Sequence, residues 1–334
     1  MLDDIFYWLF NMSIIGGLSG GVILLFRKIR RIPRRVICIL WAIPFLRFTI
    51  PVFFGGRYSL MSLLSYITER TVTVLPSIKE PIVLYKTVDV LEMLNRFDMT
   101  QMNCLQLAIR YFPIEYKDSL MMPIYGTATY SVNVIEELMK VASAVWAVVA
   151  VGLITAFSMI YFTTGHTLKD SRHFRDNIYF SEKLDTPAVF GILRPRIIIP
   201  EGCNRMDLTY VLLHENAHVK AGDNLWRLVG ILIASVHWFN PLSWIFLKCF
   251  LSDLELACDE RVLSICDEEE KKKYALSLLD FAEKRTVFLS TFGGARVKLR
   301  VENILTYKKI TVTSAVAFSL LIIAAAYLLL TNGV

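Results

Sequence analysis

The chain has 334 residues, of which 55% are hydrophobic and 20% charged, and its mean hydropathy is +0.49. Globular proteins carry about 45–50% apolar residues, so the composition excludes an ordinary soluble domain. The formal net charge of +6 lies mostly in one basic segment and not in a stripe interleaved with aromatic residues, so no direct nucleic-acid binding is expected.

Four stretches are long enough to cross a bilayer, which takes about 20 apolar residues. They lie at 5–26, 36–54, 141–162 and 312–330. The sequence therefore predicts a mainly α-helical membrane protein with four transmembrane helices. Arg47 lies inside the second stretch and is costly in lipid, so we expect it to face the helix bundle or to reach an interface.

The basic segment at 27–35 sets the predicted orientation, because short Lys/Arg-rich loops stay in the cytoplasm. Residues 1–54 are then a two-helix hairpin whose cytoplasmic turn lies against anionic lipid. The other predicted parts are an extracellular loop at 55–137, a third transmembrane helix at 138–163, a cytoplasmic domain at 164–310, and a fourth transmembrane helix with a short tail at 311–334. Both termini are predicted to be outside.

The predicted cytoplasmic domain begins with short runs of β-branched and aromatic residues bounded by Gly and Pro, which predict a small antiparallel sheet. The runs lie at 178–180, 188–190 and 197–199. One interpretation gives the sheet a purely structural role. In the other, an exposed edge strand formed by Ile197, Ile198 and Ile199 binds an extended substrate peptide by strand addition.

A helix is predicted at 205–221, with Gly222 as its stop. It carries His214, Glu215 and His218 in the pattern His-Glu-x-x-His. Two histidines four residues apart point to one side of a helix and can bind one zinc ion, and Glu215 can then take a proton from metal-bound water. The alternative is a surface helix with two solvated histidines. The zinc interpretation requires a third ligand.

An Asn-Pro pair predicts a second helix over about 241–264, with Asn240 as its N-cap and Pro241 as its first residue. Glu255 and Asp259 share one face of it. We predict that Glu255 is the third zinc ligand and that Asp259 orients a ligand histidine by accepting a hydrogen bond from its other ring nitrogen. A solvated acidic face and a Cys258 ligand are the alternatives.

The stretch 225–239 is apolar but too short to span a bilayer comfortably. The sequence leaves open whether it and the following helix are buried in the domain core or enter the membrane. His237, within this stretch, is expected to be a satisfied core or interface histidine. Downstream, the segment 268–309 predicts two amphipathic helices joined by a glycine-containing link at 290–294.

These motifs together resemble the BlaR/MecR antirepressor metallopeptidases. The resemblance covers nearly the whole chain and rests on His214-Glu215-x-x-His218 with Gly222-Asp223, on Asn240-Pro241-Leu242, on Glu255-Leu256-Ala257-Cys258-Asp259, and on the segment 190–197. It implies a multi-pass protein of the bacterial plasma membrane, with a gluzincin-like α+β zinc peptidase domain inserted between the third and fourth transmembrane helices. It also implies one zinc ion per chain, bound by His214, His218 and Glu255, with Glu215 as general base and Asp259 in support.

The resemblance further implies a zinc endopeptidase in signal transduction that cleaves a cytoplasmic DNA-binding repressor, and also itself, after an external signal. The expected self-cleavage site lies near Thr291-Phe292-Gly293. Sensing members carry a penicillin-binding domain after the last span, whereas this chain ends four residues after Leu330, so covalent β-lactam sensing is not expected. A homodimer and a separate sensor protein stay open as partners.

Two other functions remain as alternatives. One is a housekeeping membrane peptidase of the prenyl-protein or quality-control type, which uses similar motifs. The other is a non-catalytic membrane receptor or scaffold whose zinc is structural. Glu215 argues against the second alternative, because structural zinc needs no adjacent base.

Overall fold

The computed structural model describes residues 2–50, 83–89, 127–184, 186–201, 205–284 and 293–331. They belong to two compact units, Met1–Tyr7 with Thr73–Trp146, and Trp8–Val72 with Ala147–Val334. In the first unit, β1 (Val83–Asp89) pairs antiparallel with β2 (Thr127–Asn133). The rest of the predicted extracellular loop, up to residue 126, lies outside the described residues.

Three helices in the described ranges are long and apolar enough to cross a membrane. They are α1 (Leu2–Lys28), the segment Leu138–Asp170, which consists of most of α7 (Val134–Thr167) and the short 3-10 helix η1 (Leu168–Asp170), and α13 (Val312–Leu330). They contain the first, third and fourth predicted stretches.

The second predicted stretch is not a single long helix in its described part. It forms α2 (Arg34–Leu40) and α3 (Ala42–Thr49), which meet at Trp41. Pro44 accounts for the break, because its ring excludes the carbonyl of Leu40, four residues earlier, and it has no N–H to bond that carbonyl. Residues 51–54 lie outside the description, and a fourth span is not confirmed.

Arg47 in α3 faces the helix bundle, as expected. Its side chain is buried, and it donates hydrogen bonds from Nε to the Leu329 carbonyl and from Nη2 to the Thr331 carbonyl, both at 2.7 Å. These carbonyls belong to the C-terminal end of α13, where a helix is partly negative. Arg47 therefore ties α3 to α13.

The helices that carry the zinc motif have the predicted bounds. The motif helix α8 runs Arg205–Ala221 and stops at Gly222, which adopts a left-handed φ of 67°. After α9 (Asp223–Val236), Asn240 begins α10 (Pro241–Leu263) by accepting a hydrogen bond from the Leu242 N–H at 2.9 Å. Local capping chemistry thus fixes where these helices start and stop.

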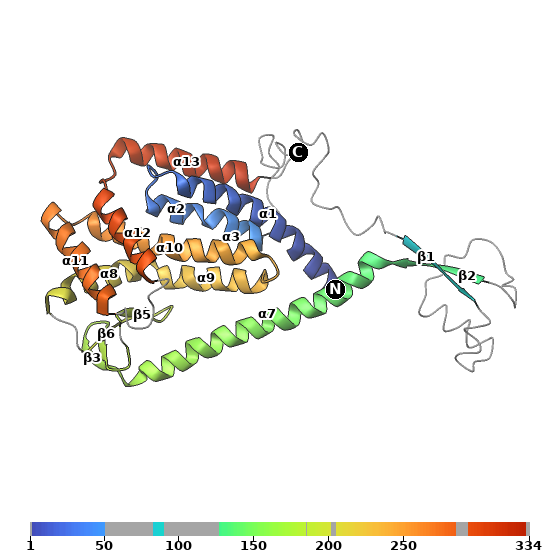
Figure 1. Cartoon of the computed structure of the whole chain (residues 1–334), viewed down its shortest axis with the longest axis horizontal. Helices are drawn as coiled ribbons and strands as arrows, with labels where there is room; N and C mark the ends of the chain where they lie inside the picture. Colours follow the sequence, from blue (N-terminus) through green and yellow to red (C-terminus); the bar gives the residue numbers. More distant parts are fainter. Residues whose placement is uncertain are drawn as a thin grey trace. The chain divides into compact units, whose positions relative to one another are not determined.

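Helix α10 contributes residues to the two larger clusters of buried hydrophobic side chains in the described part of the second unit. Its first half packs with α2, α3, α9 and α13, and its second half packs with α8, α11 (Glu268–Lys284) and α12 (Gly293–Thr306). Figure 1 shows α10 between α9 and the pair formed by α2 and α3. The two amphipathic helices predicted after α10 are present as α11 and α12.

The small sheet has four strands and a mixed topology. Its strands are β3 (Arg172–Arg175), β4 (Ile178–Ser181), β5 (Ala188–Phe190) and β6 (Arg196–Pro200), in the spatial order β3-β4-β6-β5. The antiparallel prediction is wrong for β4 and β6, which pair in parallel. Strand β6 lies between β4 and β5, where it runs antiparallel to β5 and parallel to β4. The pattern of hydrophobic residues in the strands does not reveal this order.

The predicted substrate edge strand is also wrong. Ile197, Ile198 and Ile199 lie in β6, which is paired on one side with β4 and on the other with β5. All three side chains are buried. Both hydrogen-bonding edges of β6 are therefore used inside the sheet, and this strand cannot accept a peptide.

The basic turn is bound by carboxylates of α10. Asp253 is fully buried, and its two carboxylate oxygens share the single Nε–H of Arg27 at 2.8 and 2.9 Å. It also accepts a hydrogen bond from Trp41 Nε1 at 3.0 Å, and Arg34 Nη1 lies 3.5 Å away. Glu260 accepts the backbone N–H of Arg34 at 2.9 Å. The predicted contact of this turn with anionic lipid therefore does not explain where Arg27 and Arg34 lie, because both bind carboxylates of α10.

We predict that Asp253→Asn destabilises the fold, because it leaves Arg27 and Arg34 without their counter-charge. Breaking a buried ion pair costs about 3–5 kcal/mol, and the low end is expected since these arginine side chains are 25% and 19% exposed. Thermal unfolding in detergent, followed by circular dichroism, measures the effect. The control Glu269→Gln changes an 80% exposed side chain and should leave the midpoint unchanged. Equal midpoints for Asp253→Asn and wild type would contradict this prediction.

Candidate metal centre

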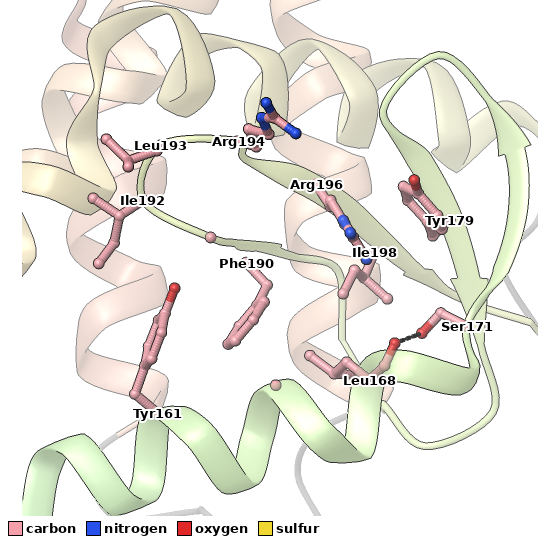
Figure 2. Close-up of a pocket in the computed structure, with 12 residues that line it drawn as sticks. Tyr161, Leu168, Ser171, Tyr179, Phe190, Ile192, Leu193, Arg194, Arg196 and Ile198 are labelled. Atoms are coloured by element: carbon pink, nitrogen blue, oxygen red, sulfur yellow. Dashed lines mark hydrogen bonds between the residues drawn. The ribbon is translucent and has the colours of Figure 1, made fainter.

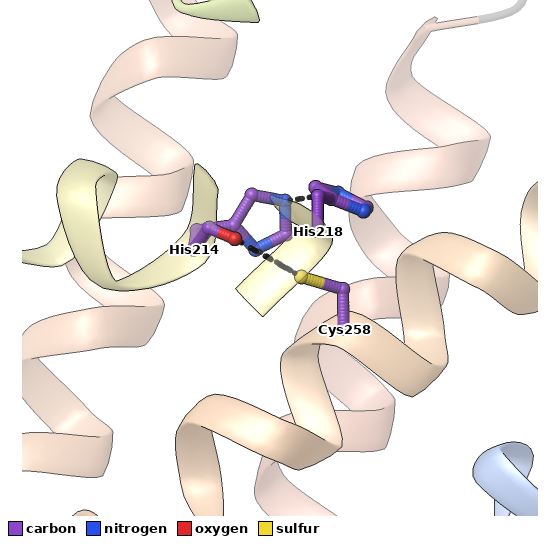
Figure 3. Close-up of side chains that lie close together, drawn as sticks. All are labelled: His214, His218 and Cys258. Carbon is purple, nitrogen blue, oxygen red and sulfur yellow. Dashed lines mark hydrogen bonds between the residues drawn. The ribbon is translucent and has the colours of Figure 1, made fainter. Parts of the chain in front are cut away.

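The two histidines of the motif meet on one side of α8. Their Nε2 atoms lie 3.2 Å apart, and their rings are perpendicular with centroids separated by 4.7 Å. Both side chains are buried, and Figure 3 shows them converging with Cys258 from α10. Two unprotonated Nε2 lone pairs directed at one point are the donor pair that a metal ion requires.

The other ring nitrogen of His218 is bound by Asp223, the first residue of α9. Asp223 Oδ2 lies 2.6 Å from His218 Nδ1 and 3.1 Å from Arg261 Nη1. Burial opposes a charged ring, but the bond to Asp223 outweighs it and raises the pKa of His218. The carboxylate fixes the tautomer that leaves Nε2 free, and a metal at Nε2 would take the place of a proton.

The other ring nitrogen of His214 is bound through Tyr274 of α11. His214 Nδ1 lies 2.9 Å from Tyr274 Oη, whose hydroxyl donates to Asp259 Oδ1 at 2.5 Å. Asp259 Oδ1 itself is 3.4 Å from His214 Nδ1. The carboxylate predicted to orient a histidine is therefore next to His214, but a tyrosine hydroxyl makes the shorter contact.

Glu255 reaches the same point as the Nε2 nitrogens of the two histidines. Its Oε2 lies 3.6 Å from His214 Nε2 and its Oε1 lies 3.6 Å from His218 Nε2. Zinc binds imidazole at about 2.0–2.1 Å, which separates tetrahedral donors by roughly 3.3 Å. The distances between these donor atoms are therefore compatible with a zinc ion held by the three side chains.

Cys258 is the other candidate for the third ligand. Its Sγ forms, with ring nitrogens of His214 and His218, a group of donor atoms within 4.8 Å of one another. However, its thiol donates to the His214 carbonyl at 3.2 Å, and its Sγ lies 3.5 Å from Nδ1, the ring nitrogen held by Tyr274. Glu255 instead faces the Nε2 atoms of both histidines, at 3.6 Å from each, and Arg300 Nη2 also lies 3.4 Å from His214 Nε2.

Arginines surround the carboxylates of the centre. Arg300 of α12 binds Asp259 through two bonds, Nε to Oδ2 at 2.8 Å and Nη2 to Oδ1 at 2.7 Å. Burial raises the pKa of Asp259, but the charge of Arg300 and its hydrogen bonds outweigh burial and lower that pKa to about 2. Arg227 of α9 donates to Glu255 Oε1 at 2.6 Å. Asp259 and Glu255 are therefore held as carboxylates.

Glu215 lies next to His214 on α8, and its side chain is 9% exposed. Within the described ranges, its carboxylate makes no hydrogen bond or ion pair, in contrast to the carboxylates of Asp223, Glu255 and Asp259. A carboxylate beside the two histidines of the candidate metal centre and without an arginine partner is available to accept a proton.

The edge of the sheet near the centre is β5. Asn224, which follows Asp223 in α9, donates from Nδ2 to the carbonyls of Val189 at 3.1 Å and Gly191 at 2.9 Å. These carbonyls lie two residues apart, as on one edge of a strand. The side-chain amide therefore occupies the edge that a strand would pair with.

Two other features lie away from the centre. His237 is buried and its Nε2 lies 3.0 Å from the Phe48 carbonyl, so it is a core histidine as expected, but it is only half satisfied because its Nδ1 is buried without a hydrogen-bond partner among the described residues. A pocket of about 910 Å³ lies between the end of α7 and the turn joining β5 to β6, lined by residues such as Tyr161, Phe190 and Arg196 (Figure 2). None of the predicted metal ligands lines this pocket.

The chain was also compared with known proteins. The family described as BlaR1 peptidase M56 matches residues 7–304. The methicillin resistance mecR1 protein of Staphylococcus aureus is 33% identical over 106 residues, which make up 30% of this chain and 18% of that protein. The regulatory protein BlaR1 of Bacillus licheniformis is 30% identical over 173 residues, 47% of this chain and 29% of that protein. The matched segments thus span less than a third of these relatives.

We predict that Glu255 and Cys258 respond differently to substitution. Glu255→Gln removes the anionic donor and should abolish stoichiometric zinc binding, whereas Cys258→Ala should retain one zinc ion per chain. Zinc content of the purified variants, by atomic absorption, decides between them. Zinc retained in Glu255→Gln and lost in Cys258→Ala would instead make Cys258 the ligand.

A second prediction concerns Asp223. Asp223→Asn keeps an acceptor for His218 but removes the charge, and loss of such a partner typically weakens metal binding about 10–100-fold. Competition with a chromophoric chelator measures the zinc dissociation constant. The control Glu302→Gln changes a 60% exposed side chain on α12 and should leave it unchanged. Unaltered affinity in Asp223→Asn would show that the bond to His218 does not support the centre.

Proposed function

The chain belongs to the BlaR1 peptidase M56 family, and we propose that it is a zinc-dependent endopeptidase of the bacterial plasma membrane acting in signal transduction. One observation carries the proposal. Glu255 and the Nε2 nitrogens of His214 and His218 converge on one point, and the carboxylate of Glu215, unpaired within the described ranges, follows His214 directly. This arrangement suits metal-assisted hydrolysis of a peptide bond.

His214, His218 and Glu255 would hold the zinc ion, which supplies Lewis acidity toward water and the scissile carbonyl when bound. Glu215 accepts the proton of the attacking water and then donates it to the leaving amine. Asp223 and Tyr274 keep the two imidazoles oriented while this proton moves. The proposed reaction thus needs one carboxylate that is free to exchange a proton, that of Glu215, and other carboxylates that hold the metal and the histidines in place.

The proposed substrate is a cytoplasmic DNA-binding repressor protein, with an external signal as the trigger. This rests on the BlaR/MecR resemblance and on the basic turn at 27–35, which favours the cytoplasmic side for the centre. Cleavage of the chain itself near Thr291-Phe292-Gly293 belongs to the same proposal, although residues 285–292 lie outside the described ranges. The proposal also keeps membrane lipid, a homodimer and a separate sensor protein as partners.

Strand β5 is the proposed binding edge for the substrate in place of β6. A peptide laid along β5 would present backbone N–H groups to the carbonyls of Val189 and Gly191, where Asn224 now donates. Because Asn224 adjoins Asp223, the peptide would reach the His218 side of the centre.

A housekeeping membrane peptidase remains the second candidate, because the same donor set would serve it. The non-catalytic receptor is disfavoured, since Glu215 is kept free of counter-ions where a structural site needs no base.

We predict that Glu215→Gln stops proteolysis and keeps the metal. General-base catalysis contributes about 10²–10⁴-fold, so the cleavage rate should fall by that factor. Wild type and Glu215→Gln, purified in detergent, are assayed for zinc and incubated with candidate repressors of the host, with Glu302→Gln as the matched control.

One zinc ion per chain in both proteins, with cleavage by wild type and Glu302→Gln alone, would support the proposal. Cleavage by Glu215→Gln would contradict the role of the base. Zinc in both with cleavage by neither would favour the receptor. Cleavage of unrelated membrane peptides at equal rates would favour the housekeeping enzyme.

A further inference from the structure

Helices α1 and α10 are joined at two levels with matched spacing. At one level Asn240, at the turn between α9 and α10, donates to Ser13 Oγ at 2.8 Å and to the Ser13 carbonyl at 3.2 Å. At the other, Arg27 Nε donates to both carboxylate oxygens of Asp253 at 2.8 and 2.9 Å.

The two contacts are separated by 14 residues in α1 (13 to 27) and by 13 residues in α10 (240 to 253). At about 1.5 Å per residue, each separation is roughly 20 Å. The two helices therefore run side by side in the same direction over this length.

Close packing accompanies these contacts. A Cβ on Gly20 of α1 would overlap the ring of Phe246 of α10, and a Cβ on Gly17 would come within 3.3 Å of Leu242. Glycines that let a neighbour approach this closely are a feature of helix pairs in membranes. The first half of α10 therefore lies directly against a membrane-spanning helix.

The depth of the turn follows from the depth of α1. Arg27 lies in the last turn of this candidate span and is the first residue of the basic segment, so it marks the membrane boundary. Asn240 then lies roughly 20 Å from that boundary, within a hydrocarbon core about 30 Å thick. We propose that α9 and the first half of α10 form a re-entrant hairpin, which enters the bilayer from the side of the metal centre and turns back inside it.

Most polar groups of the turn have partners within the protein, and His237 Nδ1 is the exception among the described atoms, because it is buried without a hydrogen bond. Ser243 Oγ donates to the His237 carbonyl at 3.0 Å, and Trp244 Nε1 donates to the Trp238 carbonyl at 3.1 Å. Asn240 is bonded to Ser13 on one side and to the Leu242 N–H on the other. Non-helical backbone is tolerated at membrane depth where its polar groups find partners in the protein.

The outer face of the hairpin is apolar and is matched to acyl chains. Its exposed large side chains are Leu225, Trp226, Leu232, Leu242 and Ile245. This face continues from α1, itself a candidate span, so its occupant is the lipid that surrounds α1. The inference depends on the membrane location of the chain and not on its peptidase activity.

The hairpin places the metal centre at the membrane surface. Glu255 follows Asp253 by two residues, about 3 Å along the helix axis. The zinc donors therefore lie just outside the level of Arg27, and a substrate peptide has to come to the lipid surface to be cut.

A fluorescent amino acid, incorporated by stop-codon suppression in the full chain, measures this depth in liposomes. It replaces Ile245 on the hairpin, Leu320 in α13 as the membrane reference, or Leu276 on α11 as the aqueous reference, all of them exposed positions. Lipids brominated in the middle of their acyl chains should quench the fluorophore at 245 as strongly as at 320. Aqueous iodide should quench the fluorophore at 276 only.

Quenching at 245 by iodide and not by bromolipid would overturn the hairpin, because the turn would then lie in water. Protection of 245 from both quenchers would also overturn it, since protein would then cover this face. Leu232 on α9 serves as a second position, so that failure of one labelled variant to fold leaves the test intact. A retained zinc content shows that each labelled protein is folded.

Discussion

The buried carboxylate of Asp253 is the interaction on which the arrangement of helices depends. An ionised carboxylate without contact to water is costly unless it is paired, and Asp253 is paired with Arg27 and Arg34 and bonded to Trp41. Two turns further along α10, Glu260 accepts the backbone N–H groups of Arg34 and Arg35, at the positive end of α2. The basic turn is therefore fixed to α10 at two points.

The opposite face of α10 carries the metal centre. Residues seven apart share a helix face, so Asp253 and Glu260 point to the turn, while Glu255 and Asp259 point away from it to the histidines. A shift of the basic turn must therefore move Glu255 unless α10 bends. The position of Glu255 is in this way coupled mechanically to the position of the basic turn.

The sequence allowed prediction of those parts that local chemistry determines. Helices α8 and α10 had readable ends because Gly222 adopts a positive φ and Asn240 caps its own helix. The order of the strands was not predictable, since hydrophobic alternation is the same for a central and an edge strand. Tyr274 and Arg300 were missed because each comes from a separate amphipathic helix and meets His214 or Asp259 only through tertiary packing. Asp223 did have a local signal, five residues after His218 and at the start of a helix.

The charges of the centre follow one physical rule. Each supporting carboxylate has an arginine within reach, with Asp223 facing Arg261, Glu255 facing Arg227, and Asp259 facing Arg300. Pairing removes most of the cost of burying these charges and holds the supports in place. Glu215 alone among the predicted site carboxylates has no such partner within the described ranges. Pairing the supporting carboxylates while leaving Glu215 without a counter-ion would restrict the proposed proton transfer to one residue.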